Sequence, residues 1–229
     1  MMGAPNEAKA LERRQFGAAF PALQENDRKL YLTAKRMQDI VASLVGLLFL
    51  LPLFIVLAIL IKLEDPKGPV LFRQTRVGKG GREFQMYKFR SMVSNAEQML
   101  EQLLDKNEVS GLMFKMKDDP RVTKIGKLIR KTSLDELPQL INVLKGEMSL
   151  VGPRPPLPRE VAVYNAYHLQ RLTVTPGCTG LWQVSGRNSV GFDEMVELDL
   201  QYIRERNLFY DIKIILKTVL LLIRPNSAY

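Results

Sequence analysis

The hydropathy pattern is dominated by one uncharged stretch, residues 40–61, which reads IVASLVGLLFLLPLFIVLAILI between Asp39 and Lys62. At about 1.5 Å per helical residue it extends roughly 33 Å, enough to cross a bilayer core of about 30 Å. Pro52 lies near its middle, where proline removes a backbone hydrogen bond and clashes with the preceding turn. The pattern therefore predicts a membrane helix that is kinked or broken at Pro52.

Both flanks of this stretch are basic. The positive-inside tendency would keep both flanks in the cytoplasm, which favours a segment that enters one leaflet and returns. An ordinary membrane-spanning anchor is the alternative, because many simple anchors also contain proline. The basic residues are Arg28, Lys29, Lys35 and Arg36 before the stretch, and Lys62, Lys67, Arg73, Arg76, Lys79 and Arg82 after it.

Residues 69–90 change to a strand pattern, in which PVLFRQTRV and REFQMYKFR flank the glycine-rich turn GKGG. This arrangement predicts a β-hairpin. Alternation would place Met86, Lys88 and Arg90 on one face and Tyr87 and Phe89 on the other. On spacing alone, a solvated strand face explains Lys88 and Arg90.

Helical patterns follow from residue 119 onward. Asp119 and Pro120 fit the N-cap and first position of one helix. A second helix is expected in TSLDELPQLINVLKGE, with two alternative starts. Ser133 and Glu136 fit a capping box, whereas Pro138 favours a later start with Asp135 as the cap. In both cases Asp135 and Glu136 fall in the first turn, where free N–H groups favour anions, so spacing alone explains them as first-turn acids.

The remaining segments predict a shaped loop, a short strand and a helical C-terminus. The run VGPRPPLPRE is too rich in proline for regular structure, and residues 176–188 predict a turn, a short strand and a second turn. If one helix runs through the C-terminal region, its basic side suits a membrane surface with anionic headgroups, although packing against a core explains it as well. That basic side comprises Arg206, Lys213, Lys217 and Arg224.

Composition narrows the class of protein. The 229 residues include 33 Lys and Arg against 24 Asp and Glu, a net charge of +9, and 46% are hydrophobic, which excludes a disordered polyelectrolyte. One Cys and one His exclude a disulfide scaffold, a Cys-ligated zinc site and a multi-His metal site. The charge permits nucleic-acid binding, but no recognised nucleic-acid motif accompanies it, so we expect a lipid surface and no nucleic acid.

Several motifs in order resemble those of one family. They are YKFRSM, DPRVTKIGKLIRKTSLDELPQLINVLKGEMSLVGPRPP, TPGCTGLWQVSGRN and the final LDLQYI…DIKIILKTVLLLI. From about residue 36 to the C-terminus the chain resembles the bacterial sugar transferases, also called monotopic phosphoglycosyl transferases.

The resemblance implies a mostly helical α+β fold at the cytoplasmic face of the bacterial inner membrane. It implies a re-entrant helix–break–helix around Pro52, with both flanks cytosolic, and a compact cytosolic catalytic domain with a small β-hairpin and interfacial amphipathic helices. The expected divisions are an N-terminal cytosolic extension over 1–35, the re-entrant helix over 36–63 and the catalytic domain over 64–229. An anionic lipid bilayer is an expected partner.

The resemblance also implies an activity, the transfer of a sugar 1-phosphate from a UDP-sugar to undecaprenyl phosphate with release of UMP. Asp135 would be the nucleophile that carries a phosphosugar intermediate, and Glu136 would bind Mg²⁺. Glucose or galactose is the expected sugar, an N-acetylated sugar is the alternative, and a non-enzymatic membrane scaffold is a third reading. Phosphate-binding roles are implied for Lys88, Arg90, Arg130, Arg154 and Arg187, and a pocket wall for Pro153, Pro155 and Pro156.

Overall fold

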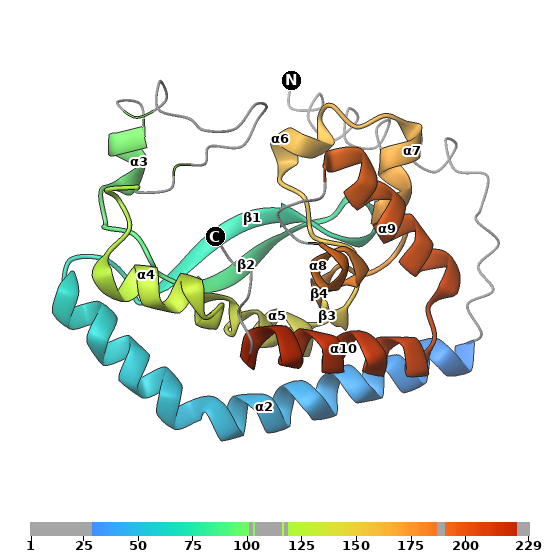
Figure 1. The fold of residues 1–229 in the computed structure, drawn as a ribbon, viewed down its shortest axis with the longest axis horizontal. Coiled ribbons are helices and arrows are strands. Elements are labelled where there is room, and N and C mark those ends of the chain that lie inside the picture. The colour runs from blue at the N-terminus through green and yellow to red at the C-terminus, as the bar shows by residue number, and fades with distance from the viewer. Residues whose placement is uncertain (1–28, 101–102, 104–115, 117–118, 187–190, 224–229) are drawn as a thin grey trace, which may run out of the picture.

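The computed structural model describes residues 29–100, 103, 116, 119–186 and 191–223. This part of the chain is a mostly helical α+β structure with two small two-stranded sheets (Figure 1). Its longer helices are α2 (Lys29–Glu64), α4 (Lys124–Lys131), α9 (Phe192–Glu205) and α10 (Leu208–Ile223). Short helical segments are η1 (Lys79–Gly81), α3 (Ala96–Leu100), η3 (Leu134–Glu136), α5 (Gln139–Lys145), α6 (Pro158–Val161), α7 (Ala166–Leu169), η4 (Gln170–Thr173) and α8 (Leu181–Ser185).

Helix α2 contains the predicted apolar stretch and lies along the rest of the molecule, following a bent course (Figure 1). It continues through Pro52, so the predicted break is a helix interior in this structure. Buried residues recur at helical spacing along it, at Asp39, Ser43, Leu57 and Ile61. Among the described residues, α2 is the one helix long and apolar enough to cross a membrane.

The outward side of α2 is strongly apolar. Its large exposed residues include Val41, Leu44, Val45, Leu48, Phe49, Leu51, Ile55, Val56 and Ile59. A water-facing helix of a globular domain normally carries polar residues on this side. The inward side packs on the domain and the outward side requires an apolar surrounding.

The predicted hairpin is confirmed. Strands β1 (Leu71–Val77) and β2 (Glu83–Phe89) pair antiparallel, with Phe72 opposite Lys88 and Arg76 opposite Phe84. Helix α5 covers the outer edge of β2 through Asn142, a fully buried side chain. Its Oδ1 accepts the Tyr87 N–H at 3.0 Å and its Nδ2 donates to the Gln85 carbonyl at 2.7 Å, so one amide replaces a neighbouring strand.

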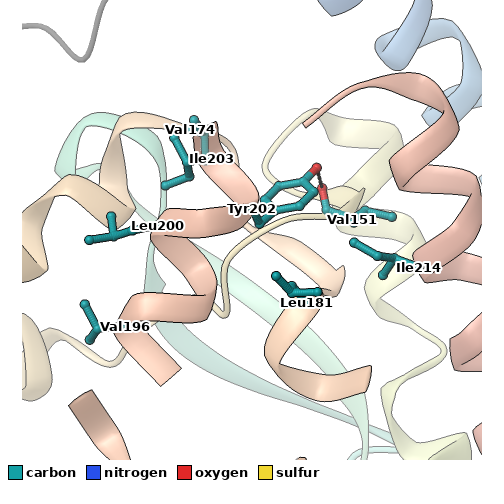
Figure 2. Packing of buried hydrophobic residues seen from close by; sticks show 8 residues of the cluster. All are labelled: Val151, Val174, Leu181, Val196, Leu200, Tyr202, Ile203 and Ile214. Atoms are coloured by element: carbon teal, nitrogen blue, oxygen red, sulfur yellow. Dashed lines mark hydrogen bonds between the residues drawn. The ribbon is translucent and has the colours of Figure 1, made fainter. Parts of the chain in front are cut away.

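A second sheet pairs β3 (Ser149–Val151) in parallel with β4 (Gly177–Thr179). The backbones of these two segments approach so closely that a Cβ on Gly177 would lie 2.1 Å from the Gly152 nitrogen. The main core surrounds this pair, and Figure 2 shows Tyr202 at its centre, donating to the Val151 carbonyl at 3.1 Å. The other core residues drawn are Val174, Leu181, Val196, Leu200, Ile203 and Ile214.

The predicted start of one helix was wrong, and the C-terminal region is helical but is not one helix. Helix α4 begins at Lys124 with Thr123 as its N-cap, because Asp119 instead forms a buried ion pair with Arg121 at 2.6 Å. The C-terminal region is two helices, because Arg206 has an extended conformation (φ −55°, ψ 133°) that ends α9. Arg206 therefore lies off α10, which keeps Lys213 and Lys217, and Arg224 lies outside the described residues.

Candidate active site

The acidic pair Asp135 and Glu136 lies in a single 3₁₀ turn, η3, between α4 and α5. Ser133 precedes it in the left-handed conformation (φ 56°), which is uncommon for a residue with a Cβ. The predicted starts of the next helix were both wrong, because α5 begins at Gln139 after Pro138 and no side chain caps it. The pair thus occupies a separate turn rather than the first turn of α5.

Asp135 is a buried carboxyl group, only 9% exposed. Burial raises its pKa from 3.8 to about 6, because an ion loses water contacts there. The charge of Lys88 opposes this shift, Glu136 adds to it and Arg130 opposes it. At neutral pH the group is mostly a carboxylate with few water neighbours, and such a weakly solvated anion is a good nucleophile.

Glu136 forms an ion pair with Lys88, with Nζ and Oε1 2.6 Å apart. Burial acts to raise the Glu136 pKa, but the nearby charges of Lys88, Arg154 and Arg76 outweigh it and hold the pKa below its usual value. The Glu136 side chain is 46% exposed, against 22% for Lys88, so a ligand can reach it. Lys88 thus lies against the acidic pair from the inward face of β2.

Arg130 comes to the site from the last turn of α4. Helix α4 approaches the chain after β2 very closely, since a Cβ on Gly126 would lie 2.0 Å from the Ser91 carbonyl oxygen. This contact brings Arg130 Nε within 2.7 Å of Ser91 Oγ. The guanidinium acts on Asp135 through its charge, and its remaining N–H groups are of the kind that bind phosphate in pairs.

The proline-rich loop is held by its own carbonyl groups. Pro153, Pro155 and Pro156 are buried. Their carbonyl oxygens accept, respectively, the Gly177 N–H at 2.9 Å, Arg76 Nη1 at 2.9 Å and the Val77 N–H at 2.9 Å. The loop therefore joins β1 to β4, and its role as a pocket wall stays a prediction.

Arg154 projects from this loop between the buried prolines. Its Nη1 lies 3.2 Å from Glu160 Oε2, and its side chain is partly exposed. Its carbonyl oxygen accepts from Arg171, which forms a fully buried ion pair with Asp199 at 2.7 Å. A buried ion pair thus fixes the backbone of a residue whose charge acts on Glu136.

Arg76 is a site residue that the sequence analysis had counted only as part of a basic flank. It shares a hairpin face with Lys88, and burial, followed by the charge of Arg154, lowers its pKa to about 10. Its charge also helps to hold Glu136 ionised. Phe72 lies opposite Lys88 in the hairpin, and Arg76 follows Phe72 by four residues, so strand alternation places Arg76 on the Lys88 face. This pattern could have identified Arg76 from the sequence.

Two of the predicted phosphate-binding residues are not brought to this cluster by the described contacts. Arg90 is buried and paired with Asp65, 3.3 Å from its Oδ2. Arg187 lies outside the described residues, as does most of the predicted N-terminal extension, residues 1–28. Their roles stay predictions.

The carboxylates present fit one particular kind of Mg²⁺ site. The described residues contain no group of three or more His, Cys, Asp and Glu that could hold a metal by themselves. Magnesium is commonly held by one or two carboxylates together with water and substrate phosphates. Asp135 and the exposed Glu136 match that arrangement, and a dedicated protein cage is not part of it.

Comparison with known proteins identifies the family. Residues 30–225 match the bacterial sugar transferase family. The chain belongs to this family. It is 40% identical over 200 residues to the exopolysaccharide production protein ExoY of Rhizobium meliloti (strain 1021), covering 86% of this chain and 88% of ExoY.

Two longer relatives of this bacterial sugar transferase are more similar in sequence. Galactosyl transferase CpsE of Streptococcus agalactiae serotype III (strain NEM316) is 54% identical over 86% of this chain and 44% of its own length. Undecaprenyl-phosphate galactose phosphotransferase of Salmonella typhimurium (strain LT2) is 46% identical over 85% of this chain and 41% of its own length. The chain thus spans less than half the length of these two relatives.

Proposed function

We propose that this protein transfers a sugar 1-phosphate from a UDP-sugar to undecaprenyl phosphate, releasing UMP, in capsule or exopolysaccharide synthesis. The observation that carries this proposal is the buried carboxyl group of Asp135, with its raised pKa, beside the Lys88–Glu136 ion pair. The names of its relatives, which include a galactose phosphotransferase for undecaprenyl phosphate, support the same reaction.

The reaction consists of two displacements at phosphorus. An Asp135 oxygen attacks the sugar-bearing phosphorus of the donor, the bond to the bridging oxygen breaks, and UMP leaves with that oxygen. The aspartate then carries the sugar phosphate as an acyl phosphate. An oxygen of the lipid phosphate attacks the same phosphorus, and the Asp135 carboxylate leaves to give the diphosphate-linked sugar lipid.

The positive charges explain how anions can meet at this carboxylate. Lys88, Arg130 and Arg154 surround the pair from three different elements, and Arg76 adds a fourth charge from β1. Fixed charges of this kind stabilise negative charge that develops in the transition state. Mg²⁺, held by Glu136 and assisted by Asp135, would supply further charge neutralisation at the phosphates.

The contacts of α2 support a monotopic arrangement at the cytoplasmic face of the inner membrane. Asp39 Oδ1 accepts the Leu150 N–H at 3.0 Å, and Glu64 Oε1 accepts the Lys124 N–H at 2.6 Å. A helix that crossed the bilayer would carry one of these residues away from the cytosolic domain. We therefore infer a re-entrant α2 whose outward side lies in one leaflet.

The exposed surface of α10 fits the same membrane plane. Helix α10 lies beside α2 (Figure 1) and exposes Phe209, Ile212, Leu216, Val219 and Leu220. Lys213 and Lys217 are exposed on the same helix. Such a helix suits an interface with anionic headgroups, at the depth where a lipid phosphate would meet Asp135.

Galactose or glucose is the sugar we propose. Relatives named for galactose include those from S. agalactiae and S. typhimurium. A relative from Aeromonas hydrophila, 40% identical, is named for N-acetylgalactosamine, which keeps an N-acetylated sugar as the alternative. The positive charges of Lys88 and Arg130 beside Asp135 suit phosphate groups, which all these donors share.

The test is UMP release by the purified full chain with undecaprenyl phosphate and Mg²⁺. UDP-glucose, UDP-galactose, UDP-N-acetylglucosamine and UDP-N-acetylgalactosamine are supplied one at a time, and Asp135→Asn is the inactive control. Lipid-dependent UMP release with one donor, abolished by Asp135→Asn and by EDTA, is the expected result. A wild-type rate in Asp135→Asn would refute the nucleophile, and polysaccharide production in cells carrying it would favour a non-enzymatic scaffold.

A further inference from the structure

An apolar cavity of about 320 Å³ lies next to the acidic turn, on the side of the hairpin opposite Lys88. Its walls come from the second half of α2, from β1 and β2, and from the start of α5. Phe54 and Phe89 meet edge to face in its wall, with ring centres 5.1 Å apart. The lining residues are Phe54, Ile55, Ala58, Val70, Leu71, Phe89, Pro138 and Ile141.

We propose that this cavity binds the isoprene units of the acceptor lipid that are nearest its phosphate. The proposal rests on the function proposed above and assigns the binding site of the lipid tail within it. It concerns a polyisoprenoid chain specifically, and not lipid tails in general.

The position of the cavity supports this occupant. Pro138 lines it, and Glu136, two residues earlier, faces the phosphate-binding cations, so the turn 135–138 separates an apolar site from a cationic one. An amphiphile with a phosphate head and an apolar tail matches this pair of sites. Head and tail would then lie on the two sides of one turn, which fixes the phosphate beside Asp135.

The opposite side of the cavity leads to the bilayer. Ile55 lines it and is 53% exposed on the outward apolar side of α2, where Val56 and Ile59 are also exposed. A tail could therefore pass from the lipid phase into the cavity without crossing a polar surface. The volume is at the lower end of the roughly 300–1,000 Å³ of small-molecule sites, so it fits the first part of a long tail and leaves the rest in the bilayer.

Ala58 offers a way to fill the cavity, and Ala42 offers a matched control. Both are alanines of α2, but Ala42 is exposed and does not line the cavity. We expect Ala58→Phe to raise the KM for undecaprenyl phosphate by about tenfold or more, as one misfitting apolar group does elsewhere. Exchange of labelled UMP into the UDP-sugar, which needs no lipid, should stay at the wild-type rate, and Ala42→Phe should match the wild type in both assays.

A second measurement is independent of turnover. A polyprenyl phosphate with a diazirine in its first isoprene units is crosslinked to the full chain in nanodiscs, and the adducts are mapped by mass spectrometry. We expect adducts in segments 54–58 and 138–141, lost in Ala58→Phe, kept in Ala42→Phe, and displaced by unlabelled polyprenyl phosphate but not by a saturated alkyl phosphate.

The outcomes separate this proposal from the proposed function. Adducts that persist in Ala58→Phe, or that map elsewhere, would overturn the tail site, and so would equal displacement by the alkyl phosphate. An unchanged KM in a folded Ala58→Phe protein would also overturn it. Absence of UMP exchange in the wild type with every donor would instead contradict the proposed reaction, while the crosslinking result would still decide the cavity.

Discussion

Asp39 and Glu64 lie near opposite ends of α2, and each accepts backbone N–H groups of the same domain. Asp39 Oδ1 receives the Leu150 N–H at 3.0 Å, and the two oxygens of Glu64 receive those of Lys124 and Ile125 at 2.6 and 3.0 Å. Arg36, three residues before Asp39, donates to the carbonyls of Val143 and Leu144 at 2.6 and 2.8 Å. Both ends of the apolar helix are thus fixed to one body.

This relationship predicts the topology of the chain in cells. Lys29→Cys and Lys67→Cys, placed at exposed positions on either side of the apolar stretch, should both react with a membrane-impermeant maleimide only when it has access to the cytosol. The native Cys178 should contribute no background, because burial raises the pKa of its thiol. Labelling of the two positions from opposite sides would establish a spanning helix.

Asp135→Asn should make the protein more stable at neutral pH while removing its activity. Burial raises the Asp135 pKa from 3.8 to about 6, so the folded state binds this proton more tightly and loses stability as pH rises through that interval. Above pH 6 the loss amounts to about 3 kcal/mol, which a neutral asparagine avoids. The unfolding temperature of the variant should exceed the wild-type value at pH 7.5 and converge with it near pH 4.

The control for that comparison is the exposed Asp193, where Asp193→Asn should change the free energy of unfolding by less than about 0.5 kcal/mol. Asp199 also has a pKa raised to about 6 by burial. It is present in both wild type and Asp135→Asn, so their difference isolates Asp135. Equal unfolding temperatures of wild type and Asp135→Asn at pH 7.5 would contradict the conclusion that the Asp135 carboxylate is desolvated.

The rate of the first chemical step should depend on the protonation state of Asp135. In the proposed reaction the carboxylate form of Asp135 attacks, so kcat/KM for UMP exchange should rise with pH, reach half its maximum near pH 6 and level off at higher pH. The measurement is the exchange rate between pH 5 and 8 at low donor concentration. A flat profile across this range would exclude a nucleophile with the pKa that burial gives Asp135.

Lys88→Met should move that profile to higher pH. The Lys88 charge lowers the Asp135 pKa, so its removal raises this pKa further and shifts the half-maximal rate upward. We also expect kcat/KM to fall by roughly 100-fold, as for other fixed donors at developing negative charge. Lys88→Arg should restore part of the rate, and Lys131→Met, at an exposed position on α4, should behave like the wild type.

Arg76→Met should weaken both the fold and the reaction. It removes the donor to the buried Pro155 carbonyl, which costs about 1–3 kcal/mol, and it removes a charge that acts on Glu136. Chemical unfolding and UMP exchange measure the two effects. Arg73→Met, at an exposed position of the same strand, is the control, and equal behaviour of the two variants would contradict a role for Arg76.

Local patterns were sufficient for several elements of this protein. The apolar stretch, the hairpin and the helical C-terminal region follow from spacing alone, because neighbouring residues along the chain determine them. The acidic pair was recognised through the motif in which it occurs, and spacing by itself explained it as a helix start. The expected helix is absent at two places. Asp119 forms a buried ion pair with Arg121 instead of capping a helix, and the extended backbone at Arg206 ends α9.

The sequence by itself determined the family, the long apolar helix and the acidic and basic residues that we propose for phosphate chemistry. Only the tertiary structure decided that the acids occupy their own 3₁₀ turn, that Arg76 joins Lys88 at one hairpin face, and that an apolar cavity adjoins them. The physical reason is that the burial of a residue and the charges near it depend on contacts between segments that are distant in the sequence. The raised pKa of Asp135 depends on contacts among β2, α4 and η3, which no local pattern records.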